Sequence, residues 1–143
     1  MGSSFSDMQD VFPAGNGGNS PLSSKASRIV AFHSTKRWKA HFDSCKNSTK
    51  LMVIYFTASW CGPCRSMEPA LDEFAAKYTD DVEFVKIDVD ELMGVSDEFG
   101  VHAMPTFILI KQGKEVDKVV GAKKDELEKK ILKHRAQAHV QSY

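Results

Sequence analysis

The chain has 143 residues, which is enough for one domain with a buried core and too short for two. Nineteen basic and nineteen acidic residues cancel to a formal net charge of zero, so the composition gives no support for recognition of nucleic acid or of an anionic membrane by charge. The three cysteines come without an apolar secretion segment or a run long enough to cross a bilayer. These features favour a reducing compartment, and we expect a cytoplasmic protein.

Residues 1–26 are predicted to form a flexible extension, because their content of Gly, Asn and Ser cannot bury enough surface to hold regular structure. We expect the folded domain to occupy residues 27–143. It begins with a predicted strand at 28–32, followed by a helix at 34–45 whose N-cap would be a serine.

The rest of the domain alternates between strands and helices. A strand at 51–57 is apolar at nearly every position, which predicts a central strand covered on both faces. A helix at 61–78 is amphipathic and contains Pro69, whose missing hydrogen bond predicts a kink. The remaining predicted elements are a strand at 82–89, a helix at 91–99, strands at 107–110 and 115–120, and a charged helix from 123 with Leu127 and Ile131 facing inward. This order predicts an α/β fold whose sheet is partly parallel and partly antiparallel.

Two of the three cysteines, Cys61 and Cys64, flank Gly62 and Pro63 at the start of a predicted helix. This spacing brings the two sulfurs within bonding distance, and a disulfide across so short a loop contributes little stability. We therefore interpret the pair as redox chemistry. Cys61 is the predicted nucleophile, because unpaired backbone amides and the dipole at a helix N-terminus stabilise a thiolate. Cys64 is predicted to resolve the mixed disulfide that Cys61 forms with a substrate.

A metal site is the competing interpretation, since Cys-x-x-Cys is also half of a zinc site. A second pair of ligands would be required. The remaining candidates are Cys45, which we expect to be inert, and histidines scattered along the chain: His33, His41, His102, His134 and His139. We therefore expect no metal.

Several short motifs together resemble the thioredoxins, specifically the h type of plants, over about residues 28–135. They are the block 56–65 (FTASWCGPCR), the sequence Met104-Pro105-Thr106, and Gly113 and Gly121. The resemblance implies the thioredoxin fold, a central mixed five-stranded sheet flanked by four helices. It also implies a cis peptide before Pro105, beside the dithiol, with Met104 offering its backbone to an extended substrate segment. The implied substrate-binding surface consists of Trp60, Gly62, Pro63, Met104, Pro105, Thr106 and Gly121.

The resemblance further implies a protein-disulfide reductase that acts as a redox carrier. A thioredoxin reductase drawing on NADPH would re-reduce the cysteine pair, with the glutathione and glutaredoxin system as the alternative donor, and the chain itself would bind no cofactor. Its implied partners are disulfide-containing proteins such as peroxiredoxins, and the protein would be mostly monomeric. Two other functions remain open: a thiol-independent binding module that uses the same apolar surface, and a glutathione-dependent oxidoreductase on the same fold.

The chain departs from the thioredoxin pattern at Tyr55, where the family usually has a buried aspartate that assists proton transfer at the resolving cysteine. The matching Lys86 is kept, and we expect it to lack its usual acidic partner. Burial in a strand would raise the phenol pKa above its ordinary value of about 10 and keep the side chain neutral. We therefore expect that Tyr55 cannot accept a proton from Cys64, which leaves solvent or a backbone group to do so.

Gly2 fits the pattern for N-myristoylation, with a serine at the sixth position. A chance match explains this short pattern equally well. A single acyl chain would give only weak, reversible membrane association. A mitochondrial presequence fits less well, because Asp7 and Asp10 are acidic and no arginine precedes Arg28.

Overall fold

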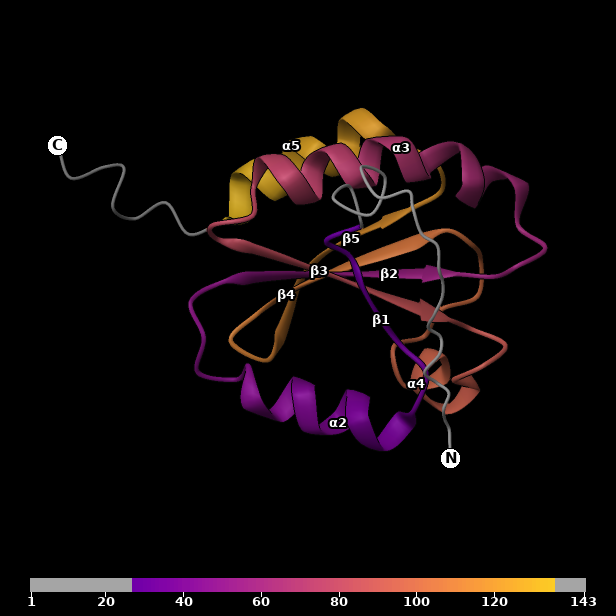
Figure 1. Ribbon diagram of the computed structural model, residues 1–143, viewed down its shortest axis with the longest axis horizontal. Helices are drawn as coiled ribbons and strands as arrows, with labels where there is room; N and C mark the ends of the chain where they lie inside the picture. Colours follow the sequence, from indigo (N-terminus) through magenta and orange to yellow (C-terminus); the bar gives the residue numbers. More distant parts are fainter. Residues whose placement is uncertain (1–26, 136–143) are drawn as a thin grey trace, which may run out of the picture.

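The structure is a computed structural model that describes residues 27–135 (Figure 1). Its elements are, in chain order, β1 (Val30–Phe32), α2 (Thr35–Ser44), β2 (Leu51–Thr57), α3 (Gly62–Lys77), β3 (Val82–Asp88), α4 (Met93–Glu98), β4 (Thr106–Lys111), β5 (Lys114–Val120) and α5 (Lys124–His134). This is the predicted order. The predicted extension at 1–26 and Gly2 lie outside the described residues. None of the helices within 27–135 is long and apolar enough to cross a membrane.

The five strands form one mixed sheet in the order β1-β3-β2-β4-β5. β1 and β2 both run parallel to β3, whereas β4 is antiparallel to β2 and to β5. In this register Tyr55 on β2 lies between Lys86 on β3 and Phe107 on β4. The predicted fold class is therefore confirmed, including the antiparallel pairing of the last two strands.

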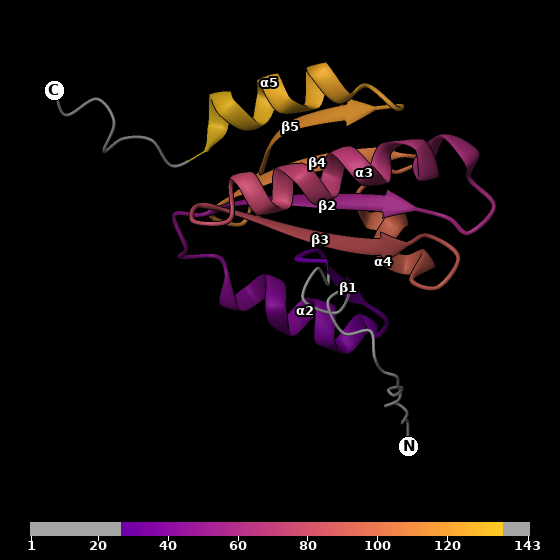
Figure 2. The same ribbon diagram turned by 45° about the horizontal axis from the view of Figure 1, so that its top comes forward.

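Helices cover both faces of the sheet, with α3 and α5 on one face and α2 and α4 on the other (Figures 1 and 2). All seven residues of β2 are buried, as the apolar sequence of this strand predicts for a central position. The core on the α3 and α5 side includes Met67, Leu71, Phe74, Leu127 and Ile131. The core on the other side includes Trp38, Ile54, Phe56, Leu92 and Val95.

The end of α5 is fastened to the loop before β3. Arg135 donates two hydrogen bonds to the Asp81 carboxylate, at 2.8 and 3.0 Å, and its guanidinium lies 4.7 Å from the ring centre of Tyr78. Charge-assisted, paired hydrogen bonds of this kind are the strongest that side chains form. They hold the end of α5 beside the loop that follows α3. Leu127 and Ile131, which were predicted to face inward, are fully buried.

Candidate functional site

The cysteine pair lies where β2 runs into α3. Cys61 is the N-cap of α3, and Pro63 occupies the first turn, where its missing N–H costs no helical hydrogen bond. Cys61 and Cys64 form a disulfide with an S–S distance of 2.21 Å. The backbone N–H of Cys64 donates to Cys61 Sγ at 3.1 Å. The predicted junction of strand, dithiol and helix is therefore confirmed, and Cys61 Sγ faces the amide end of α3.

The residues before and between the cysteines form an exposed rim. Trp60 is 64% exposed, and Gly62 and Pro63 are also exposed. The Trp60 indole Nε1 donates to Asp90 Oδ2 at 2.8 Å, which fixes the ring against the loop after β3. An exposed aromatic ring held in one orientation offers apolar contact area with little conformational entropy left to lose on binding.

The loop before β4 lies at the same end of the sheet, because Thr106 pairs with Phe56 near the end of β2. The Met104–Pro105 peptide is cis, as the resemblance implies. Gly121, at φ 104°, donates its backbone N–H to the Pro105 carbonyl at 2.8 Å. Pro105 and Thr106 are buried, whereas Met104 is half-buried. The side chains of Pro105 and Thr106 therefore pack inside the protein, and Met104 is the residue of this motif that is partly exposed.

Tyr55 is buried, at 1% exposure, and stacks on Phe107 with the ring centres 5.3 Å apart. Its hydroxyl lies 3.2 Å from both the Cys64 carbonyl and Glu68 Oε2, and it donates to these two acceptors. Burial, with a smaller contribution from the Glu68 carboxylate, raises the pKa of Tyr55 to about 12. The phenol is therefore neutral near pH 7 and acts as a donor, as the sequence predicts.

Lys86 lacks its usual strand aspartate, as expected, but a different acidic residue, Glu68, faces it. The Lys86 Nζ lies 4.0 Å from Glu68 Oε2. Glu68 comes from α3, four residues after Cys64, whereas the family's usual aspartate belongs to the strand position that Tyr55 occupies here. Cys64, Glu68, Lys86 and Asp88 also line one pocket. Glu68 was not predicted from the sequence, although its helical spacing from Cys64 is a signal that could have indicated it.

A dithiol at a strand-to-helix junction, beside a cis-proline loop on this mixed sheet, defines a thiol-disulfide oxidoreductase of the thioredoxin fold. The family model described as Thioredoxin matches residues 30–133 of the sequence. The chain belongs to the thioredoxin family. In this family the redox-active cysteine pair serves in place of a bound cofactor.

Among known proteins, the chain is 58% identical over 113 residues to Thioredoxin H2 of Arabidopsis thaliana, covering 79% of this chain and 84% of the relative. The crystal structure of a thioredoxin h from Nicotiana alata is 68% identical, with a TM-score of 0.75, and the match covers 76% of this chain and 94% of that one. A structure concerned with thiol resolution in yeast mitochondrial 1-Cys peroxiredoxin through the glutathione and thioredoxin systems is 37% identical, with a TM-score of 0.65, covering 73% and 94%. The resemblance to plant h-type thioredoxins is thus confirmed.

Proposed function

We propose that Cys61 is the attacking thiolate and Cys64 the resolving thiol in the reduction of protein disulfides. The observation that carries this assignment is the N-cap position of Cys61, whose sulfur accepts the Cys64 amide at 3.1 Å. A thiolate at that position is stabilised by the helix N-terminus, which favours Cys61 as the nucleophile. Cys64 lies further along the helix, and its own backbone N–H is the group that donates to Cys61 Sγ.

In the proposed cycle the Cys61 thiolate attacks one sulfur of a target disulfide, forms a mixed disulfide and releases the other target sulfur as a thiolate. Cys64 then loses its proton and attacks Cys61 Sγ. The Cys61–Cys64 bond closes, and the second target thiol leaves. Two electrons pass to the target, and a thioredoxin reductase supplied by NADPH, or the glutathione system, returns two electrons to the chain.

Glu68 is the group that accepts the Cys64 proton in this proposal. It lines the same pocket as Cys64, and a water molecule there would connect the thiol to the carboxylate. The Tyr55 hydroxyl and Lys86 both face Glu68 Oε2, at 3.2 and 4.0 Å, and both hold the carboxylate in place. Tyr55 itself serves as a positioning residue, because a neutral phenol is no base at pH 7.

Target proteins would bind across the exposed rim of Trp60, Gly62 and Pro63, with an extended segment pairing along the Met104 backbone. Gly121 supports the same loop through its hydrogen bond to Pro105. Recognition through backbone and a flat apolar rim suits many different partners. Peroxiredoxins are one proposed class, supported by the subject of the yeast structure, whose thioredoxin-like chain shares 37% identity with this one.

We also propose a cytoplasmic location and a mostly monomeric state, with weak membrane association where Gly2 is acylated. Residues 1–26 would contribute nothing to the core. Deleting residues 1–24 should therefore leave the midpoint of thermal unfolding and the rate of insulin reduction nearly unchanged. A loss of several degrees would show that these residues pack on the domain. Mass spectrometry of the protein from plant cells tests acylation of Gly2.

Trapping of mixed disulfides tests the assignment of the two cysteines. Cys64→Ser should accumulate a mixed disulfide with target proteins, because the attack proceeds and the resolution fails. Cys61→Ser should form none and should not reduce insulin. Trapping through Cys64 in the Cys61→Ser protein would reverse the assignment. Binding of the same targets by the Cys61→Ser, Cys64→Ser double variant would instead support a thiol-independent binding module.

A further inference from the structure

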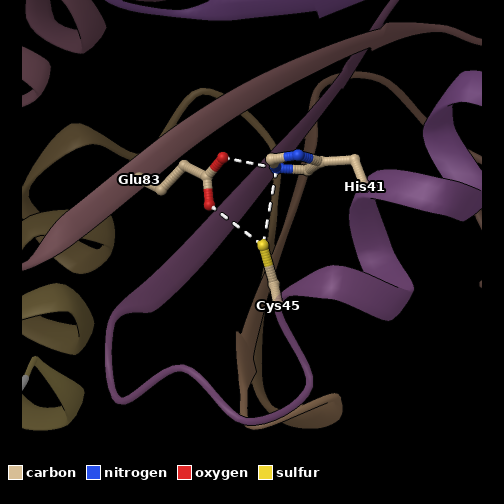
Figure 3. Close-up of side chains that lie close together, drawn as sticks. All are labelled: His41, Cys45 and Glu83. Carbon is tan, nitrogen blue, oxygen red and sulfur yellow. Dashed lines mark hydrogen bonds and ion pairs between the residues drawn. The ribbon is translucent and has the colours of Figure 1, made fainter.

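We propose that His41, Cys45 and Glu83 form a binding site for a divalent transition-metal ion of the zinc class. Figure 3 shows the three side chains converging, His41 and Cys45 from the C-terminal part of α2 and Glu83 from the start of β3. The ligand atoms all lie within 4.8 Å of one another. Glu83 pairs with Met52 at the beginning of β2, whereas the dithiol follows the end of that strand. The proposed site and the dithiol are therefore at opposite ends of the sheet.

The spacing of the ligand atoms matches a tetrahedral ion at two of three edges. Cys45 Sγ lies 3.6 Å from His41 Nε2 and 3.7 Å from Glu83 Oε1. Ligand atoms at ordinary zinc distances stand about 3.3 to 3.6 Å apart in a tetrahedron. The other carboxylate oxygen of Glu83, Oε2, lies 2.5 Å from His41 Nε2 in a direct hydrogen bond. An ion bound through Oε1 would replace that hydrogen bond, since an imidazole nitrogen that binds a metal has no proton to donate.

The three ligands are held by the fold. His41 and Cys45 are four residues apart and therefore lie on one face of α2. The His41 ring packs against Phe32, with ring centres 4.9 Å apart, and the Cys45 backbone N–H bonds to the His41 carbonyl at 3.1 Å. The side chains of His41 and Glu83 are 28% and 22% exposed. The site is thus preorganised, partly dehydrated and still reachable from solvent.

The charges balance a divalent cation. A Cys45 thiolate and the Glu83 carboxylate carry two negative charges, and a neutral imidazole adds none. Without an ion the thiol keeps its proton near neutral pH, as a free cysteine does. On binding, the ion would displace that proton to solvent and form the metal–sulfur bond. Lys50 and Arg28 line the cavity beside Cys45, and both positive charges are expected to weaken cation binding.

The donor set of one imidazole, one thiolate and one carboxylate favours zinc over magnesium or calcium, which prefer oxygen ligands alone. A fourth position is available, because Cys45 and Glu83 line a cavity together with Ser44, Ser48 and Lys50. Water would fill it. The alternative role for the same residues is a hydrogen-bonded clamp that ties α2 to β3 without any ion.

Equilibrium dialysis against zinc chloride tests the proposal. The full chain is stripped with a chelator and kept oxidised, so that the Cys61–Cys64 pair does not compete for metal. We expect one zinc per chain. Cobalt(II) should give a thiolate-to-cobalt charge-transfer absorption, present in the Cys61→Ser, Cys64→Ser variant and absent in Cys45→Ser. Loss of a direct ligand should weaken zinc binding by about 100-fold or more, since even outer-shell partners account for 10–100-fold.

Two further variants keep the test independent of folding. Glu83→Gln removes the ligand charge at nearly constant shape and should also lose zinc, while Lys50→Gln should bind it more tightly. His33→Gln is the matched control, because His33 forms a comparable pair with Glu91 at 2.8 Å without a cysteine nearby. Its zinc affinity should equal that of the unmodified chain. Absence of stoichiometric zinc, or zinc binding that survives both Cys45→Ser and Glu83→Gln, would overturn the proposal. The three residues would then serve only as hydrogen-bonding partners that join α2 to β3.

Discussion

The Tyr55 hydroxyl donates a hydrogen bond to Glu68 Oε2 at 3.2 Å. This contact joins the residue that replaces the family's usual buried aspartate to a carboxylate on α3, the helix that carries Cys64. In this chain the acidic residue near Cys64 is thus on helix α3 instead of on strand β2. Lys86 faces it, 4.0 Å from the same oxygen. A buried phenol also avoids the desolvation cost that a carboxylate would bear at position 55.

Glu68→Gln should slow the decay of the mixed disulfide by about tenfold at neutral pH. This is less than the 10²–10⁴ of an essential general base, because solvent also accepts the Cys64 proton. The rate in this variant should rise more steeply with pH than in the unmodified protein. Stopped-flow measurement of the decay provides the test. Glu73→Gln, an exposed position on the same helix, is the control, and equal rates in all three proteins would exclude Glu68 from the proton path.

Tyr55→Phe should slow the resolving step only slightly, because Lys86 still faces the Glu68 carboxylate and the phenol is no proton acceptor, while the loss of its hydrogen bonds costs about 1 kcal/mol of stability. Tyr55→Asp should speed resolution and destabilise the fold by about 1 to 3 kcal/mol, since it buries a carboxyl group. Urea unfolding and mixed-disulfide decay measure the two effects. A large slowing in Tyr55→Phe would show that the hydroxyl takes part in the proton transfer.

Asp90→Ala should raise the KM for a protein disulfide such as insulin by up to about fivefold, because it frees the Trp60 ring from its one described hydrogen bond, worth about 1 kcal/mol. The rate with a small aromatic disulfide should not change, since so small a substrate does not cover the rim. Asp97→Ala, at an exposed position of α4, is the control. Equal loss with both substrates would mean that Asp90 acts on the dithiol itself.

Asp117 should make folding sensitive to acid. Burial opposes its ionisation, but hydrogen bonds from Lys130 and His134, at 3.0 and 2.9 Å, outweigh burial and lower the pKa of Asp117 from 3.8 to about 2. A lowered folded pKa contributes stability that is fully present above the unfolded value and is lost as pH falls from about 4 to about 2. The contribution is about 2 kcal/mol. Asp117→Asn should lack this part of the acid transition, as measured by urea unfolding between pH 2 and pH 6.

The fold could be predicted because its signals are local. The unbroken apolar run of β2 indicated burial on both faces, and Ser34 acts as the N-cap of α2, accepting the Arg37 amide at 3.2 Å. The redox pair Cys61 and Cys64 could be predicted for the same reason, since the two cysteines belong to one helical turn. The cis peptide before Pro105 followed from the resemblance alone, because most X-Pro bonds are trans.

The partners of these residues could not be predicted, because they depend on how separate elements pack. Glu68 faces Lys86 only because α3 lies over β3, and Glu83 meets His41 only because α2 covers the opposite face. Helical spacing alone could have paired Glu68 with Cys64, and His41 with Cys45. Without the sheet register, however, nothing identified which acidic residue completes each group.

Pro69 follows Glu68 inside α3. Since proline donates no backbone hydrogen bond, the carbonyl of Arg65 loses its partner four residues on. The missing bond falls within the turn that carries both Cys64 and Glu68. That turn has one backbone hydrogen bond fewer than a regular helix, so its shape depends more on side chains buried in the core, with Met67 inside the turn and Leu71 and Phe74 beyond it.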